Sequence, residues 1–337
     1  MKADFAFHDG TLLLYPTRKD VWRRNAELIA ETVTDLAQTL ARLEPTVLGV
    51  LPELDKNRIQ TSCPDVRVKV MTYDDIWARD SGAVPTKDGL VKFGFNAWGG
   101  DEGLYGSWAQ DATLPEQMSE LLGKDLSLSS LTLEGGNLLT DGNGTLICIR
   151  STIVNDNRNP GISEAEAERE LKRVLGVERI IWIDKGLVLD ETGGHIDNLC
   201  AFADENTLLI AWTDDPNDPN YTVVRGALKS IEASAGKKYD IIKIPLPSSF
   251  VRTEEDCEGL EYHDGSKPRL PGEVIQPSYI NFIFANGAVI VPTFDDPMDD
   301  EVKRIFESAM PGRRVIPFPA REVVLGGGGL HCITKNY

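Results

Sequence analysis

Cys332 stands in the segment GGGGLHCIT (326–334), shortly after four consecutive glycines. Its thiol is the strongest nucleophile of the segment, because the thiolate form attacks electrophilic carbon. Glycine leaves the backbone bare, so that a ligand or another part of the chain can approach it closely. The segment taken alone fits two interpretations equally well: a nucleophile at a close backbone approach, and a hinge before a buried strand cysteine.

Three other short motifs combine glycine with acidic, imidazole or indole groups. WARDSG contains Trp77 and Asp80, LEGGN contains Glu134, and TGGHID contains His195 and Asp197. Three carboxylates with a single arginine make a poor site for an anion and a good site for a cation. Carboxylates bind a planar guanidinium through paired hydrogen bonds, and a tryptophan face adds cation–π attraction. Together, the motifs predict a pocket for a guanidinium.

Cys332 would supply the chemistry once a guanidinium is bound. The guanidinium carbon is a poor electrophile, so cleavage needs a thiolate nucleophile and an acid that protonates the departing ammonia. We expect a covalent amidino-thioether on Cys332, with His195 acting first as acid and then as base toward water. Neighbouring carboxylates should raise the pKa of Cys332, and a bound guanidinium or a protonated His195 should lower it again. The product is a ureido group.

Two of the candidate residues also have a purely structural interpretation. His195 could bond only its own loop, although the glycines and the aspartate around it favour a functional role. Glu134 could merely accept hydrogen bonds from the backbone of the two glycines that follow it. Four scattered histidines argue against a metal site, and the glycine run lacks the GxGxxG pattern of a dinucleotide site. No metal and no cofactor is therefore predicted.

Two neighbours of the candidate residues are expected to point away from the substrate. Arg79 precedes Asp80, and adjacent side chains in an extended segment face opposite sides. His331 precedes Cys332 in a predicted strand over 330–334, so by the same alternation it should pack behind the pocket.

The elements between the motifs repeat along the chain. Four segments follow the same order of strand, loop, tight hairpin and helix, and a fifth copy is divided between residues 11–50 and 313–334. Asp-Gly and Asn-Gly pairs between apolar runs are strong hairpin signals. The hairpins are predicted to turn at 87–89, 141–144, 204–206 and 286–287. Helices are predicted at 115–122, from the capping box Ser163–Glu166, after Tyr221, at 299–310, and along the apolar face of 29–43.

These repeats predict an α/β fold of five ββαβ blades, a five-bladed propeller with pseudo-fivefold symmetry that is closed by pairing of N- and C-terminal strands. One domain over residues 1–337 is expected, although length alone would allow two. The alternative is an open α/β sheet with coincidental hairpins. Equivalent loops of a ring face the same end of its axis, so the motifs would meet in one central pocket.

The charge balance excludes several classes of partner. Asp and Glu outnumber Lys and Arg by 53 to 35, which gives a net charge of −18. Such a surface repels nucleic acid and anionic membranes and attracts small cations. Five cysteines without CxxC spacing, and no apolar run long enough for a membrane span, indicate a cytoplasmic protein. A homo-oligomer is compatible with the sequence.

The motifs WARDSG, FNAWGG, LEGGN, DGNGT, TGGHID and GGGGLHCIT together resemble the agmatine deiminase and bacterial-type peptidylarginine deiminase family. This family belongs to the guanidine-modifying superfamily, whose fold is a five-bladed α/β propeller. The resemblance implies a metal-independent deiminase, and agmatine deiminases of the family form N-carbamoylputrescine and ammonia. The implied site residues are Cys332 as nucleophile, His195 as general acid and base, Asp80 and Asp197 on the guanidinium, Glu134 as a further carboxylate, and Trp77 as a substrate contact.

The chain departs from the agmatine deiminase pattern on both sides of the His-Cys pair. Gly329, a candidate substrate contact, replaces an asparagine that is common there, and Lys335-Asn336 replace glutamines. The reaction class is unaffected, but the substrate is less strictly specified. Free arginine or peptidylarginine, transfer of the amidino group to an amine, and simple binding of a guanidine are therefore alternatives.

Agmatine is nevertheless the expected substrate, because the motif loops offer no cation other than Arg79 for a substrate carboxylate. The long loop FVRTEEDCEGLEYHDG (250–265) is expected to cover the pocket. Its candidates for the amine of agmatine are Glu254, Glu255, Asp256 and Glu258. Arg252 and Arg269 are the candidates that would instead serve a carboxylate.

Overall fold

The computed structural model describes residues 1–234 and 239–337. In these residues, five sheets follow one plan, in which an antiparallel pair of strands is followed by a parallel neighbour. The first sheet has the order β18 (Lys335–Asn336), β1 (Thr11–Leu14), β2 (Thr46–Val50), β3 (Arg67–Val70). The others are β4 (Val84–Pro85), β5 (Leu90–Gly94), β6 (Leu126–Thr132); β7 (Leu139–Thr140), β8 (Thr145–Ile149), β9 (Arg179–Ile183); β10 (Cys200–Phe202), β11 (Thr207–Trp212), β12 (Asp240–Pro245); and β15 (Ile283–Ala285), β16 (Ala288–Thr293), β17 (Arg314–Pro319). A separate two-stranded sheet pairs β13 (Phe250–Val251) with β14 (Val274–Ile275).

A helix connects the two parallel strands of each pair, as parallel pairing requires. The connecting helices are α1 (Glu27–Ala41), α2 (Lys56–Ser62), α4 (Leu114–Leu122), α6 (Glu164–Leu175), α7 (Tyr221–Ser234) and α8 (Asp299–Ala309). Three short helices, α3 (Ala78–Ser81), α5 (Arg150–Ile153) and α9 (Arg321–Leu325), lie in loops. No helix among the described residues is both long and apolar enough to cross a bilayer.

Local sequence signals account for much of this order. The predicted capping box is present at the start of α6, where Ser163 and Glu166 bond each other's backbone N–H groups. The apolar face predicted for α1 is buried, from Ile29 to Leu40. All four predicted hairpin turns lie between the expected antiparallel strands. The predicted elements are thus confirmed over most of the described chain.

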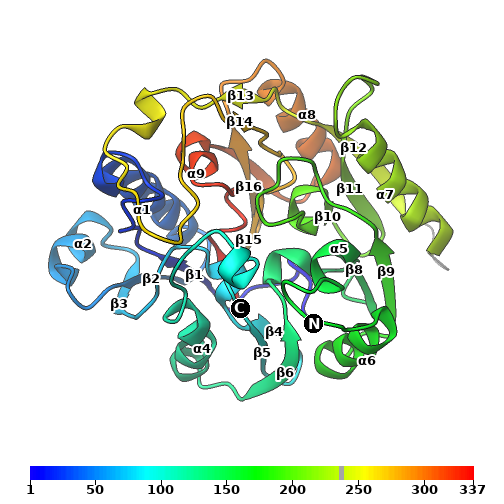
Figure 1. The fold of residues 1–337 in the computed structure, drawn as a ribbon, viewed down its shortest axis with the longest axis horizontal. Coiled ribbons are helices and arrows are strands. Elements are labelled where there is room, and N and C mark those ends of the chain that lie inside the picture. The colour runs from blue at the N-terminus through cyan, green and yellow to red at the C-terminus, as the bar shows by residue number, and fades with distance from the viewer. Residues whose placement is uncertain (235–238) are drawn as a thin grey trace.

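The two ends of the chain meet in the first sheet. Strand β18 pairs antiparallel with β1, with Thr11 opposite Asn336 and Leu12 opposite Lys335, and Figure 1 shows the N- and C-terminal ends side by side near the centre of the view. The expected pairing of terminal strands is therefore confirmed.

The predicted strand over 330–334, however, is wrong, because these residues form turns. The backbone N–H groups of His331 and Cys332 donate to the side chain of Asn281, and Thr334 bonds back to His331. Local and side-chain partners therefore satisfy the groups that a strand would have paired with its neighbour.

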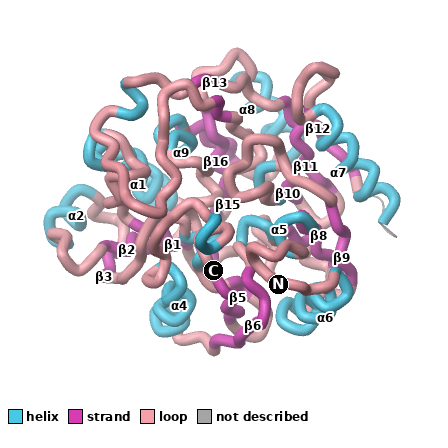
Figure 2. Tube along the Cα trace, viewed as in Figure 1, coloured by secondary structure: helices cyan, strands magenta, loops and turns pink. Residues whose placement is uncertain are grey.

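The predicted motifs occupy one structural position in the repeated units, the loop before the first strand of a sheet. WARDSG precedes β4, LEGGN precedes β7, TGGHID precedes β10, and the glycine run precedes β18. Loops make up much of the middle of the molecule in Figure 2. The fold thus explains how segments far apart in the sequence supply residues to one place.

Candidate active site

Asp80, His195 and Asp197 meet above the backbone of Gly136. A Cβ atom on Gly136 would lie 2.7 Å from Asp80 Oδ1 and His195 Nδ1 and 3.0 Å from Asp197 Oδ2. Only glycine therefore allows the LEGGN loop to pass so close to all three groups. The N–H of Gly136 also donates to Asp80 at 2.9 Å. All three side chains are at most 6% exposed, so the cluster is almost dry.

Glu134 holds the other side of the His195 ring. Its Oε2 lies 3.3 Å from His195 Nε2, and its Oε1 accepts a hydrogen bond of 3.0 Å from Nε of Arg158. Arg158 is itself buried and also donates to the carbonyl of Thr192. The alternative that Glu134 only caps the glycines after it is not observed, because the Gly136 N–H donates to Asp80 instead. Glu134 therefore orients the imidazole, and its negative charge is partly balanced by Arg158.

Cys332 approaches this cluster through Asp197. Its sulfur lies 3.7 Å from Asp197 Oδ2 and accepts a hydrogen bond of 3.2 Å from Nδ2 of Asn281. The N–H groups of His331 and Cys332 both donate to Oδ1 of Asn281, which fixes the orientation of the amide. The sulfur lies 3.2 Å from Nδ2 and 3.4 Å from Oδ1 of this amide. The nucleophile candidate therefore has a defined position beside one carboxylate and one amide donor.

Indole rings form a wall beside the cluster. Trp98 donates from Nε1 to Asp80 at 2.9 Å, and Trp77 donates from Nε1 to Asp75 at 2.8 Å. A Cβ atom on Gly328 would lie 2.5 Å from the Trp77 ring and 3.2 Å from Cβ of Cys332. The glycine run is therefore needed to bring the indole and the cysteine together. Because these glycines pack against the indole and the cysteine, the interpretation of the segment as a mere hinge is insufficient.

The charges of the cluster shift the pKa values of its members. Burial disfavours the charged form of His195, but Asp80, Glu134 and Asp190 outweigh burial and raise its pKa to about 10. Burial, Asp197 and Asp80 raise the pKa of the Cys332 thiol well above its usual value. Burial is also the main cause that raises the pKa of Asp80. At neutral pH His195 is therefore an acid and Cys332 a thiol, as expected for a thiol near carboxylates.

Two buried polar atoms of the cluster have no hydrogen-bond partner among the described residues: Nδ1 of His195 and Oδ1 of Asp197. An unpaired buried polar atom is costly, so such atoms in one cluster indicate a place for a polar ligand. A guanidinium N–H would pair Asp197 Oδ1. The second atom, His195 Nδ1, lies 3.7 Å from Asp80 Oδ2.

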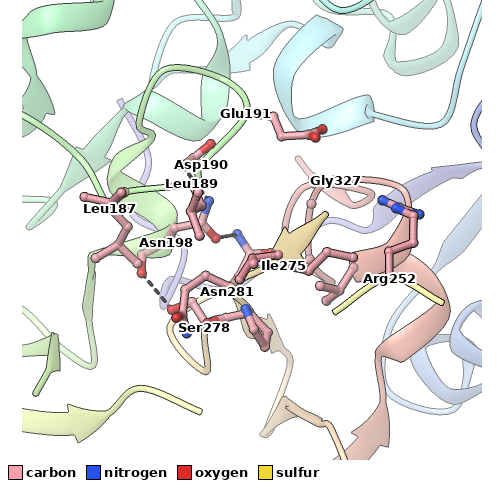
Figure 3. A pocket seen from close by; sticks show the side chains of 17 residues that line it. Leu187, Leu189, Asp190, Glu191, Asn198, Arg252, Ile275, Ser278, Asn281 and Gly327 are labelled. Atoms are coloured by element: carbon pink, nitrogen blue, oxygen red, sulfur yellow. Dashed lines mark hydrogen bonds between the residues drawn. The ribbon is translucent and has the colours of Figure 1, made fainter. Parts of the chain in front are cut away.

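A pocket adjoins the cluster and opens outward. Gly328, Gly329, Asn198 and Asn281 line its inner side, and Asn281 also contacts the sulfur of Cys332. In Figure 3, Asn198, Ser278 and Asn281 lie close together and share hydrogen bonds, with Glu191 and Arg252 across the pocket. The predicted contact residue Gly329 thus lies at the junction of pocket and cluster.

The carboxylates of the long loop 250–265 do not line this pocket. Glu255 and Glu258 pair with Arg24, and Asp256 receives two hydrogen bonds from Arg321, at 2.7 and 3.0 Å. Glu254, the fourth candidate, is also absent from the lining, so none of the four predicted partners of a substrate amine is observed on the wall of this pocket. The acidic lining comes instead from Asp190 and Glu191, in the TGGHID loop.

The two arginines of this region are also paired. Arg252 bonds Glu273 at 3.1 Å and the carbonyl of Leu325, and it lines the pocket. Arg269 pairs with Glu191 and donates to the carbonyl of Gly326 at 2.8 Å. Neither is a free cation waiting for a carboxylate.

Arg79 points away from the pocket, as predicted, and pairs with Asp4 at 3.1 Å. The expected reason was wrong, because Arg79 and Asp80 lie in the helical turn α3 and not in an extended segment. His331 also lies on the side of Asp4, yet its Nδ1 bonds Asp197 at 2.9 Å. Because residues 330–334 form no strand, the argument from alternating side chains does not apply to His331. The residue instead contacts Asp197 of the cluster.

Sequence reasoning missed Asn281 and Arg158. One signal for Asn281 was present: an asparagine stands two residues before β7, β10 and β15, at Asn137, Asn198 and Asn281. Comparing the repeats position by position would have found it. Arg158 lies in the loop between α5 and α6, outside the quoted motifs, so nothing in the pattern marked it.

Comparison with known proteins identifies the family. The model of the Porphyromonas-type peptidyl-arginine deiminase family matches residues 1–337. The chain belongs to this family. An agmatine deiminase of Pseudomonas aeruginosa (strain LESB58) is 39% identical, over 100% of this chain and 94% of the relative. A putative agmatine deiminase of Latilactobacillus sakei is 37% identical, over 100% of this chain and 95% of the relative.

Solved structures of the family also match closely. The agmatine deiminase of Enterococcus faecalis superposes with a TM-score of 0.94 at 28% identity, covering 100% of this chain and 94% of that one. A putative arginine deiminase of Porphyromonas gingivalis gives a TM-score of 0.82 at 26% identity, covering 99% and 97%. The chain therefore has the α/β fold of these deiminases.

Proposed function

We propose that the protein is an agmatine deiminase, a hydrolase that converts agmatine and water to N-carbamoylputrescine and ammonia. The observation that carries the proposal is the position of the Cys332 sulfur, 3.7 Å from Asp197, in a buried cluster with Asp80, Glu134 and His195. The near relatives named agmatine deiminase support the substrate. The reaction needs no metal and no cofactor.

Asp80 and Asp197 bind the guanidinium in this mechanism. Asp197 offers an oxygen without a partner among the described residues, and Asp80 accepts hydrogen bonds from the Gly136 backbone and the Trp98 indole, with His195 3.7 Å away. A planar cation between two carboxylates gains charge-assisted hydrogen bonds in a dry site. Trp77, Glu134 and Gly329 complete the proposed contacts: an indole face, a further carboxylate and a bare backbone.

Substrate binding also prepares the nucleophile. The carboxylates that raise the pKa of Cys332 become neutralised once the cation lies between them, so the thiol ionises more easily. The amide of Asn281 donates toward the sulfur and stabilises the thiolate. The cysteine is therefore most reactive when a substrate is bound.

Catalysis then proceeds in two halves. The thiolate forms an S–C bond to the guanidinium carbon, His195 gives its proton to one amino group, and the C–N bond breaks with release of ammonia. The neutral His195 next takes a proton from water as the water oxygen bonds the same carbon. The C–S bond breaks, the thiolate returns, the hydroxyl group on the carbon gives its proton to solvent water, and the neutral ureido product leaves. The raised pKa of His195 suits its first role, because the ring is protonated at neutral pH.

The outer pocket favours a substrate tail that ends in a cation. Asp190 lines it and has no cationic partner among the described residues, whereas Glu191 is paired with Lys267 and Arg269, and Arg252 with Glu273. The ammonium of agmatine fits this lining better than the α-carboxylate of free arginine. Deimination of free arginine or peptidylarginine is the second candidate, since the family model carries the peptidyl-arginine name.

We also propose a five-bladed propeller in a single domain over residues 1–337. Five sheets of one plan, placed around the middle of the view in Figure 1, support this arrangement. All five cysteines are unpaired, which suits a reducing cytoplasm.

Ammonia release from agmatine, free arginine and arginine peptides tests the function. We expect agmatine to exceed arginine by a wide margin in kcat/KM, with peptides poor or inert. Equal or better turnover of arginine or a peptide would overturn the substrate and leave the chemistry standing. Added amines that yield amidino-transfer products would identify an amidinotransferase, and binding without turnover would identify a guanidine-binding module.

A further inference from the structure

The imidazole of His331 lies between two carboxylates at the rear of the cluster. Its Nδ1 is 2.9 Å from Asp197 Oδ2, and its Nε2 is 3.4 Å from Asp4 Oδ2. The residue is 8% exposed, so water does not replace these partners. Both ring nitrogens thus face an acceptor, which requires a proton on each and makes the ring a cation.

Asp4 is held from the other side by Arg79. The guanidinium of Arg79 contacts Asp4 Oδ1 at 3.1 Å and also donates from Nε to the carbonyl of His331 at 3.4 Å. The backbone N–H of Arg79 donates to the carbonyl of Cys332 at 3.1 Å. His8 fixes the same segment, because its ring bonds the Asp4 carbonyl at 2.7 Å. Asp4 therefore belongs to a rigid contact between residues 1–9 and the Cys332 loop.

The chain of contacts leads from Asp4 through His331 to one oxygen of Asp197. That oxygen, Oδ2, is bound to the imidazole, while Oδ1 has no partner among the described residues. A carboxylate that is hydrogen-bonded through one oxygen presents its other oxygen in a fixed direction. Without His331, Asp197 could rotate toward another donor and would no longer be set for a planar cation.

We propose that His331 and Asp4 are positioning residues for Asp197, which they orient so that its free oxygen meets the guanidinium of the substrate. The proposal rests on the proposed function for the identity of that ligand. Its structural content, a doubly protonated His331 that depends on Asp4, stands independently of the substrate.

A direct role of His331 as a second acid or base toward Cys332 is a poorer explanation. Both of its ring nitrogens are already engaged by Asp197 and Asp4. Over the residues the structure describes, no hydrogen bond or ion pair joins the His331 ring to the Cys332 sulfur. His331 therefore acts through Asp197.

Asp4→Asn is the sharpest variant, because it removes the charge and keeps the shape. Asp9→Asn is its matched control: the same segment and the same chemistry, but an exposed carboxylate that pairs only with Lys2 and Lys124. We expect Asp4→Asn to lower kcat/KM for agmatine on the order of 10-fold, mainly through KM, because Asp197 binds substrate. Asp9→Asn should stay within about 2-fold of the wild type.

A double-mutant cycle separates positioning from general stability. In an Asp197→Asn background, Asp4→Asn should cost less than about 2-fold more, because the residue that it positions is already changed. If the fold losses in kcat/KM of the two single variants multiply in the double variant, the proposal is overturned and Asp4 has a merely structural role. Unchanged kinetics in Asp4→Asn would overturn it as well.

Nitrogen-15 NMR of the histidine rings tests the same contact without substrate. We expect the ring of His331, assigned with His331→Asn, to keep a proton on both nitrogens to a higher pH in the wild type than in Asp4→Asn. Loss of the second proton at the same pH in both proteins would overturn the proposal. If the wild type did not turn over agmatine, the proposed function would fail, and the NMR result would still decide the role of Asp4.

Discussion

The buried cluster and the loop 250–265 are both rich in carboxylates, but they treat their charges differently. In the cluster, Asp197 keeps an oxygen without a partner among the described residues, and the hydrogen bonds of Asp80 come from the Gly136 backbone and the Trp98 indole, with His195 3.7 Å away. In the loop, Asp256 accepts two hydrogen bonds from Arg321 and two from Thr253, and Glu258 is bound by Arg24. A cationic ligand therefore gains a partner in the cluster and would have to displace one in the loop. The difference shows that the pairing of acidic residues, more than their number, decides where a cation binds.

The largest expected effect tests the nucleophile of the cluster. Cys332→Ser should lower turnover of agmatine by at least about 10³-fold, because an alkoxide is far less accessible than a thiolate near neutral pH. Ammonia release measures it, and mass spectrometry after treatment with a haloacetamidine should find one label, on Cys332. Cys257→Ser is the matched control, a half-buried cysteine outside the cluster that should leave activity unchanged. A label on Cys257 instead would refute the assignment.

The next largest loss of activity is expected for His195, the acid and base of the cluster. His195→Asn should lower kcat by about 10²–10⁴-fold and leave KM nearly unchanged, because proton transfer is lost while the carboxylates remain. His331→Asn should mainly raise KM. The opposite pattern, with His331 controlling kcat and His195 mild, would mean that the two histidines have been assigned the wrong roles.

The two guanidinium carboxylates are expected to come next. Asp80→Asn or Asp197→Asn removes one partner of a buried cation, which costs about 3–5 kcal/mol, or roughly 10²–10⁴-fold in kcat/KM. Steady-state kinetics with agmatine measures the loss, and isothermal titration with a Cys332→Ala background measures binding alone. Normal affinity in both variants would show that these residues do not bind the guanidinium. The contrast between the cluster and the loop would then be wrong.

Lys335, at the rear of the cluster, gives a pH-dependent effect on stability. Burial, and then Arg79, lower its pKa to about 7 from 10.5, while Asp4 and Asp80 oppose the shift. The folded state then binds the proton more weakly than the unfolded chain, so the charge destabilises the fold fully below pH 7, and this penalty disappears as the pH rises to 10.5. The Tm of Lys335→Met relative to the wild type should therefore be highest below pH 7 and fall between pH 7 and 10.

Thermal melts at several pH values measure this trend, and other titrating groups cancel in the difference. Lys303→Met, on the exposed side of α8, is the control and should show no such trend. A difference in Tm that is constant with pH would show that the Lys335 amine does not lose its proton near pH 7.

The smallest expected effect lies in the loop. Asp256→Asn should lower the Tm, because a buried carboxylate loses its charge beside Arg321, but change kcat and KM for agmatine by less than about 2-fold. Glu191→Gln, on the wall of the pocket, should raise KM more. A large change in KM for Asp256→Asn with none for Glu191→Gln would show that the loop, and not this wall of the pocket, contacts the substrate.

The same contrast explains what the sequence could predict. Cys332, His195, Asp80 and Asp197 stand in short glycine motifs at one position of a repeated unit, so topology alone brings them together. The partners of the loop carboxylates come from unrelated places: Arg24 lies 234 residues from Glu258. No local pattern announces such a pair. The turn at 330–334 was missed for a similar reason, since the side chain of Asn281, 50 residues away, takes the N–H of His331.

One feature of the fold affects how the protein is made. Strand β1 can complete its sheet only when residues 335–336 are available, and Cys332 joins a cluster whose first member is Asp80. At usual rates of synthesis these parts leave the ribosome on the order of tens of seconds apart. A nascent chain therefore carries its carboxylates long before its nucleophile, and catalysis begins only after Cys332 has emerged.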